Sequence, residues 1–194
     1  INRDNDTYQF LCSRLITTTP ANDQEALYNF FVTNPKLVIN CYDKFANEQK
    51  TKFITTLLML WLDKCNDIHD SEKLFFFKKS VFGNLYAYAK FDNDTVRLYK
   101  KWYDYDAVDD HVKTEYQMIL GGALFEPIYV GIDHRGGNIN KQDIEKYINE
   151  VAVVPLPAIC IKYIADNGNW EDVKATCGLI FDVVTSVSGF VGGM

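Results

Sequence analysis

The residues of this sequence best placed to bind a ligand form a short loop, 133–137. The loop follows a predicted strand and precedes a predicted helix. Backbone N–H groups in glycine turns, together with the positive end of a helix, favour anions. The glycines could instead only supply turn conformations with positive φ, and Asp133 could pair locally with the arginine. The candidate anion-binding residues are His134, Arg135, Gly136 and Gly137.

No motif for catalysis or metal binding accompanies this loop. The five cysteines form no C-x-x-C pair and no Cys/His group with zinc spacing. As an EF-hand, the loop would place Ile144 where calcium needs a carboxylate. The three histidines have no serine or cysteine nucleophile motif beside them. We therefore expect no metal, no cofactor and no catalytic residue, with a small enzyme or toxin built around 133–137 as the alternative.

A second candidate surface lies in a predicted β-hairpin in the middle of the chain. Segments 85–91 and 95–103 alternate in polarity on either side of a polar turn, the usual pattern of a hairpin. Between Lys73 and Tyr103 there are seven basic and two acidic residues, a net charge of +5 in a chain of net charge -6. The candidate interaction residues are Tyr86, Tyr88, Arg97, Tyr99 and Trp102.

Three interpretations of this basic and aromatic hairpin are open. It could stack the bases of a nucleic acid, form the solvated face of a sheet with tyrosines in cross-strand pairs, or dock an acidic protein. The sequence pI near 5.0 argues against general nucleic-acid binding. We favour the solvated sheet face and expect no nucleic-acid partner.

The elements that must position these residues are predominantly helical. Periodic apolar residues and capping patterns predict helices at 7–17, from Asn22, from Asn34-Pro35, and at 47–64. Further helices are predicted around Leu74–Phe77, from Asp109-Asp110 to Gly121, from Asn140, and after Pro155 and Pro157, with a strand at 127–132. We expect residues 1–194 to form a single, mostly α domain, a multi-helix bundle with a β-hairpin inserted in the middle.

The last predicted helix, 170–187, is apolar nearly all round. It is near the length of a membrane span but contains Asp182, and a charge at mid-helix costs about 3 kcal/mol on insertion scales. We expect it to pack against protein, with membrane insertion of 170–194 as the alternative. The missing initial methionine and this apolar end predict a module cut from a longer chain.

Two regions resemble parts of large exported bacterial toxins. Asn34–Phe45 with Asn47–Lys50 is similar to their helical scaffold segments. Gly168–Val173 with the apolar helix and Gly-rich exit resembles the pre-toxin region of polymorphic toxins. The resemblance implies a non-catalytic helical module of a secreted or injected bacterial effector. Its partner would be the adjacent toxin segment or the secretion apparatus, and the module would package or position that segment.

Overall fold

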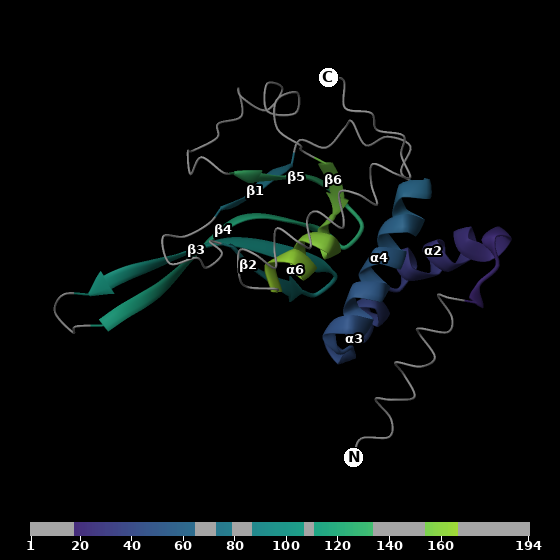
Figure 1. The fold of residues 1–194 in the computed structure, drawn as a ribbon, viewed down its shortest axis with the longest axis horizontal. Helices are drawn as coiled ribbons and strands as arrows, with labels where there is room; N and C mark the ends of the chain where they lie inside the picture. The colour runs from purple at the N-terminus through teal and green to yellow at the C-terminus, as the bar shows by residue number, and fades with distance from the viewer. Residues whose placement is uncertain (1–17, 65–72, 79–86, 107–110, 134–153, 167–194) are drawn as a thin grey trace, which may run out of the picture.

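The computed structural model describes residues 18–64, 73–78, 87–106, 111–133 and 154–166 (Figure 1). Several predictions lie outside these residues. They are the helices at 7–17, from Asn140 and at 170–187, the loop residues His134, Arg135, Gly136 and Gly137, and Tyr86.

The predicted helices between residues 22 and 64 are confirmed. A short 3-10 helix, η1, precedes α2, and three α-helices follow one another with short connections. A fourth, short helix, α6, comes late in the chain. The helices are η1 Ala21–Asp23, α2 Gln24–Thr33, α3 Pro35–Lys44, α4 Asn47–Lys64 and α6 Ala158–Asp166.

The predicted caps of α2 and α3 differ from the structure. The residue before α2 is Asp23 rather than Asn22, and its side chain makes no capping hydrogen bond. Pro35 does occupy the first turn of α3, as predicted. The Asn34 side chain, however, turns back and donates from Nδ2 to the carbonyl of Phe30, 2.8 Å away. It therefore satisfies the end of α2 instead of the start of α3.

The strands make the domain α+β rather than a helical bundle, so the predicted fold class is wrong. Two three-stranded sheets are present, one mixed with the order β1-β5-β6 and one antiparallel with the order β2-β3-β4. The predicted hairpin is β2 and β3, and the predicted strand at 127–132 is β5. The strands are β1 Leu74–Lys78, β2 Ala87–Asp92, β3 Thr95–Asp106, β4 His111–Ala123, β5 Pro127–Asp133 and β6 Val154–Pro157.

The bundle prediction was wrong because two strands carry patterns that also suit helices. β1 is a short run of consecutive apolar residues, and such a run does not distinguish a buried strand from a helix segment. It pairs in parallel with β5, placing Phe75 opposite Val130. β4 pairs with β3 along its length, but the register shifts at Leu98/Tyr99 and leaves Ile119 as an extra residue. This bulge breaks the two-residue alternation by which a strand is recognised.

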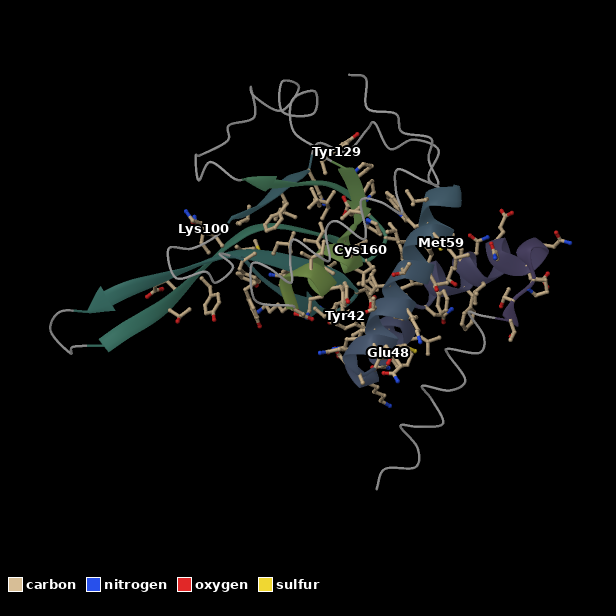
Figure 2. All side chains as sticks on the ribbon, in the orientation of Figure 1. Tyr42, Glu48, Met59, Lys100, Tyr129 and Cys160 are labelled. Carbon is tan, nitrogen blue, oxygen red and sulfur yellow. The ribbon has the colours of Figure 1, made fainter. Side chains whose placement is uncertain are left out.

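The core is centred on α6, whose residues 158–165 are all buried. One side of α6 lies on the inner face of β2-β3-β4, and another side contacts α4 (Figure 1). Ala87 and Ala89 line the β2 part of that face, and their small side chains let the helix approach the sheet closely. Cys160 lies in this interior (Figure 2). Burial raises the pKa of its thiol, so it stays a neutral, small apolar side chain.

The N-terminal helices bury the faces that their spacing predicts. Val38, Cys41, Tyr42 and Phe45 are all buried. α4 buries six large apolar side chains. On α2, Leu27 and Phe31 are buried, whereas Phe30 is exposed. The six buried side chains of α4 are Phe53, Ile54, Leu57, Leu58, Leu60 and Trp61.

The turn 124–126 between β4 and β5 joins the helices to the sheets. The carbonyls of Leu124 and Glu126 accept the backbone N–H groups of Ile159 and Ala158, at 3.0 and 3.1 Å. Two of the N–H groups left free at the start of α6 are thereby satisfied. The carbonyl between them, of Phe125, accepts the indole Nε1–H of α4 Trp61 at 2.8 Å.

Candidate interaction surface

The outer face of β2-β3-β4 presents tyrosines and cations because its strands alternate in burial. In β2, Ala87 and Ala89 point into the core, which leaves Tyr88 and Lys90 outside. In β3, Val96 and Leu98 are buried, and Arg97 and Tyr99 point the other way. The register places Tyr88 opposite Tyr99 and Lys90 opposite Arg97.

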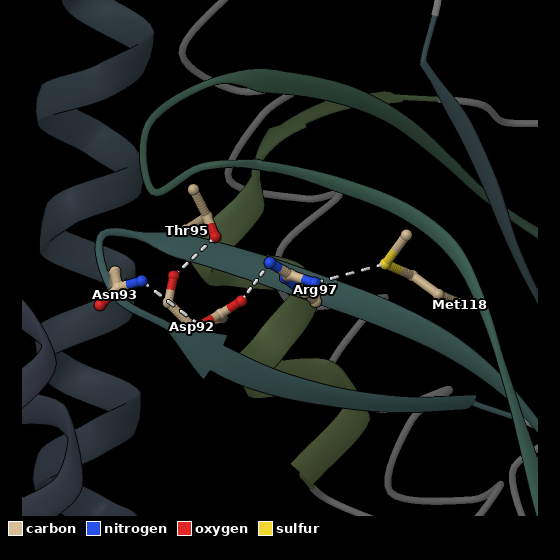
Figure 3. Close-up of polar contacts among 5 residues, drawn as sticks. All are labelled: Asp92, Asn93, Thr95, Arg97 and Met118. Carbon is tan, nitrogen blue, oxygen red and sulfur yellow. Dashed lines mark hydrogen bonds and ion pairs between the residues drawn. The ribbon is translucent and has the colours of Figure 1, made fainter.

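The turn between β2 and β3 fixes this register. Asn93 has φ 52°, in the left-handed region that asparagine tolerates better than most residues. Thr95 donates from Oγ1 to the carbonyl of Asp92 at 2.7 Å, and Asn93 Nδ2 reaches the Asp92 carboxylate at 3.5 Å (Figure 3). The predicted turn at 92–94 is therefore confirmed.

Three tyrosines from three strands cluster on this face. The Tyr88 ring lies 5.9 Å from that of Tyr99 and 5.2 Å from that of Tyr116, centroid to centroid. The rings are tilted by 46° and 57°, within the range of favourable aromatic pairs. Tyr88 is 42% exposed, Tyr116 is 49% exposed, and Met118 beside them is 54% exposed. We call Tyr88, Tyr99, Tyr116 and Met118 the tyrosine face.

The cations around the tyrosine face have partners. Lys90 Nζ lies 5.2 Å from the centroid of the Tyr99 ring, within cation–π range. Arg97 forms an ion pair with Asp92, and its Nη1 lies 3.9 Å from the sulfur of Met118 (Figure 3). Across residues 87–106 and 111–123 there are five basic and five acidic residues, so this sheet is neutral overall. The +5 counted along the sequence from 73 to 103 is therefore not a property of the sheet.

The structure tests only part of the predicted sites. Tyr88, Arg97 and Tyr99 lie together, as candidate interaction residues should. The backbone of Trp102 lies on β3 opposite Glu115, and its side chain is outside the described part of the structure. Tyr86 and the loop residues His134 to Gly137 also fall outside it. Tyr116 and Met118 were missed, because residues 109–121 were predicted to be a helix.

A second cluster of polar and aromatic side chains lies where α3, α6 and β2 meet. Lys162 is the one buried charged side chain among the described residues. Its Nζ lies 2.5 Å from Asp166 Oδ1 and also forms an ion pair with Oδ2. Tyr42, labelled in Figure 2, donates its hydroxyl to Asp166 Oδ2 at 2.6 Å. Asp166 itself is exposed at the end of α6, whereas Tyr42 and Lys162 are buried. We call Tyr42, Lys162 and Asp166 the buried triad, after its two buried members.

Aromatic rings and burial set the charge states of the buried triad. Lys162 Nζ lies 5.3 Å from the centroid of the Tyr42 ring and 5.2 Å from that of Phe91. Burial raises the pKa of the Tyr42 hydroxyl above its usual value, and the negative charge of Asp166 raises it further. The hydroxyl therefore stays protonated and donates to Asp166. Each polar group is satisfied by the others, which suits a structural role in the core.

Among the described residues, no group of three or more His, Cys, Asp or Glu side chains is arranged to hold a metal ion. No helix in the described part of the chain is both long enough and apolar enough to cross a membrane. The predicted helix at 170–187 lies outside that part.

No protein-family model matches this chain, and no curated protein or solved structure is significantly similar to it. The resemblance to scaffold and pre-toxin regions therefore stays a prediction.

Proposed function

We propose that the chain is a non-catalytic protein-binding module of a larger exported bacterial effector, and that it positions an adjacent polypeptide segment. The binding surface is the tyrosine face. The observation that carries this proposal is the exposed tyrosine cluster with Met118 and Arg97 beside it. Protein interfaces are enriched in Tyr, Met and Arg, and tyrosines frequently dominate their binding energy.

Three features favour a protein over a nucleic acid on this face. The cations are engaged within the chain, Arg97 with Asp92 and Lys90 with the Tyr99 ring. The sheet has equal numbers of basic and acidic residues, whereas nucleic-acid binding draws its affinity from excess positive charge. The tyrosine rings tilt against one another, which leaves less ring surface on which successive bases could stack.

The effector part of the proposal rests on the sequence resemblance at 34–50 and 168–173. The domain formed by this chain is α+β, so the proposed module is not the helical bundle that the resemblance implied. The segment to be positioned is the polypeptide that the parent gene encodes beside this chain. A gene that encodes these residues alone would contradict this part.

The test measures binding of that neighbouring segment, produced separately, to the 194-residue chain by calorimetry. Replacing Tyr88 and Tyr99 by serine should weaken binding roughly tenfold or more, since buried tyrosines at interfaces are common hot spots. The control is Met59→Ser on α4, an exposed methionine away from the tyrosine face. Equal affinity for the tyrosine variant and the control would refute the proposed surface.

A further inference from the structure

The outer edge of β4 is closed at one end and open along its middle. At the closed end, Lys73 donates from Nζ to the carbonyl of Gly121 at 2.7 Å, and Glu126 accepts the N–H of Ala123 at 3.0 Å. Lys73 and Glu126 also form an ion pair at 2.6 Å. A Cβ on Gly122 would lie 2.7 Å from Glu126 Oε2, so a glycine there makes room for this arrangement.

The open part of the edge is 116–119. Four consecutive residues there are exposed, although a strand half-covered by a core normally alternates. The bulge at Ile119 explains the break, because it leaves both Met118 and Ile119 outside. From Tyr116 to Phe125 the sequence has no charged residue and no proline, the devices that usually protect an edge strand.

Backbone groups at this edge point outward at alternate residues. The carbonyl of Gly121 and the N–H of Ala123 face away from β3, since Lys73 and Glu126 reach them there. Because the bulge inserts Ile119 as an extra residue, the next outward positions along β4 are Met118 and Tyr116. Their backbone groups therefore also face away from β3. In the described part of the chain, no strand pairs with this side of β4.

We propose that the edge of β4 at 116–119 pairs antiparallel with the same edge of a second copy of this chain. A two-fold axis at Gln117 places Tyr116 of each copy opposite Met118 of the other. Both residues direct backbone groups outward, so the pair is hydrogen-bonded. An aromatic ring opposite a thioether is a favourable contact.

The charges along this edge allow a second copy as the occupant. In the two-fold register no like charges face each other across the pair. Here the paired residues are uncharged except Glu115, which falls opposite Ile119. β3 and β4 extend beyond β2 as a two-stranded ribbon (Figure 1), and Tyr116 lies where this ribbon begins. Pairing would join two β2-β3-β4 sheets into one of six strands.

The experiment is sedimentation velocity on the 194-residue chain from micromolar to millimolar concentrations, because one short strand pair makes a small, weak interface. The wild-type chain should dimerise as concentration rises. Met118→Lys and Tyr116→Glu should each weaken the dimer roughly tenfold, and the double variant, which places opposite charges across the two-fold axis, should recover most of the loss. Met59→Lys on α4, an exposed methionine of similar accessibility, should leave the dimer unchanged.

Three results would overturn the proposal: a monomer at every concentration, a dimer insensitive to Met118→Lys, or a double variant as weak as the single ones. Circular dichroism establishes that each variant is folded. If Met118→Lys does not fold, Ile119→Glu replaces it and should also weaken the dimer, because it places a second carboxylate opposite Glu115 of the other copy. Tyr116 and Met118 belong to both proposed surfaces, so replacing Tyr88 and Tyr99 by serine separates the two proposals. These two residues lie on β2 and β3, away from the β4 edge, and their replacement should leave the dimer unchanged.

Discussion

The buried triad and the tyrosine face use the same side-chain chemistry in opposite environments. Each contains a lysine within cation–π distance of a tyrosine ring, Lys162 over Tyr42 and Lys90 over Tyr99. In the triad the lysine is buried and ion-paired with Asp166. On the tyrosine face the lysine is exposed to water. A buried charge depends on its partners, whereas an exposed one is solvated with or without them. The triad should therefore govern stability, and the face should govern binding.

The largest expected effect is a difference in the free energy of unfolding between variants of Lys162 and Lys90. Lys162→Ala should lower the free energy of unfolding by about 2–3 kcal/mol, mainly because it removes the packing of the buried lysine stem. The lost ion pair adds less, since Asp166 is partly solvated. Lys90→Ala should cost less than about 1 kcal/mol. Urea denaturation of both variants measures the difference. Equal losses would show that burial does not distinguish the two sites.

The Tyr42 hydroxyl gives the next largest effect. Tyr42→Phe should cost about 1–2 kcal/mol near neutral pH, because Asp166 loses a hydrogen-bond donor. The raised pKa also predicts a pH dependence. Above about pH 10 the unfolded chain loses the Tyr42 proton while the native chain keeps it, so stability falls as pH rises.

Comparing the pH slopes of the two proteins isolates this proton. The wild-type free energy of unfolding should fall more steeply than that of Tyr42→Phe, by up to about 1.4 kcal/mol per pH unit above pH 10. Urea titrations at several alkaline pH values provide the slopes. Parallel slopes would mean that Tyr42 ionises in the native protein as readily as in the unfolded chain.

The smallest expected effect concerns the exposed ion pair of Arg97 with Asp92. Arg97→Gln should change stability by less than about 1 kcal/mol, because both side chains are partly in water. Added salt should reduce even that difference, since it screens exposed charges. Thermal unfolding at low salt and at about 1 M NaCl provides the comparison. A loss as large as that of Lys162→Ala would place the Arg97 pair in the same class as the triad.

Much of the local structure could be predicted from the sequence. The helices between residues 22 and 64 follow from local apolar periodicity, and Val38, Cys41, Tyr42 and Phe45 are buried as that periodicity requires. The β2-β3 hairpin follows from alternation around a polar turn. The sheet β1-β5-β6 could not be predicted, because β1 with β5 and β5 with β6 pair segments that are distant in sequence.

Only part of the tyrosine face could be predicted, because only part of it lies on strands with regular alternation. Tyr88, Arg97 and Tyr99 lie on strands that alternate regularly. Tyr116 and Met118 lie beside a bulge, where the extra residue Ile119 imitates helical spacing. The Gly121-Gly122 pair could have indicated the strand. We interpreted it as the end of a helix, but glycines also occur in strands that other groups approach closely. The buried triad had a weaker signal, a lysine four residues before an aspartate in an otherwise apolar segment.

The turn at 124–126 also decides where the chain can be cut or extended. Its three carbonyls are bonded to α6 and α4, so a reporter domain inserted there would remove acceptors from both helices at once. The turn at Asn93-Asp94 is exposed and bonds mainly within its own hairpin. An epitope tag or a circularly permuted terminus should therefore be placed at Asn93-Asp94, where foreign sequence would extend into solvent.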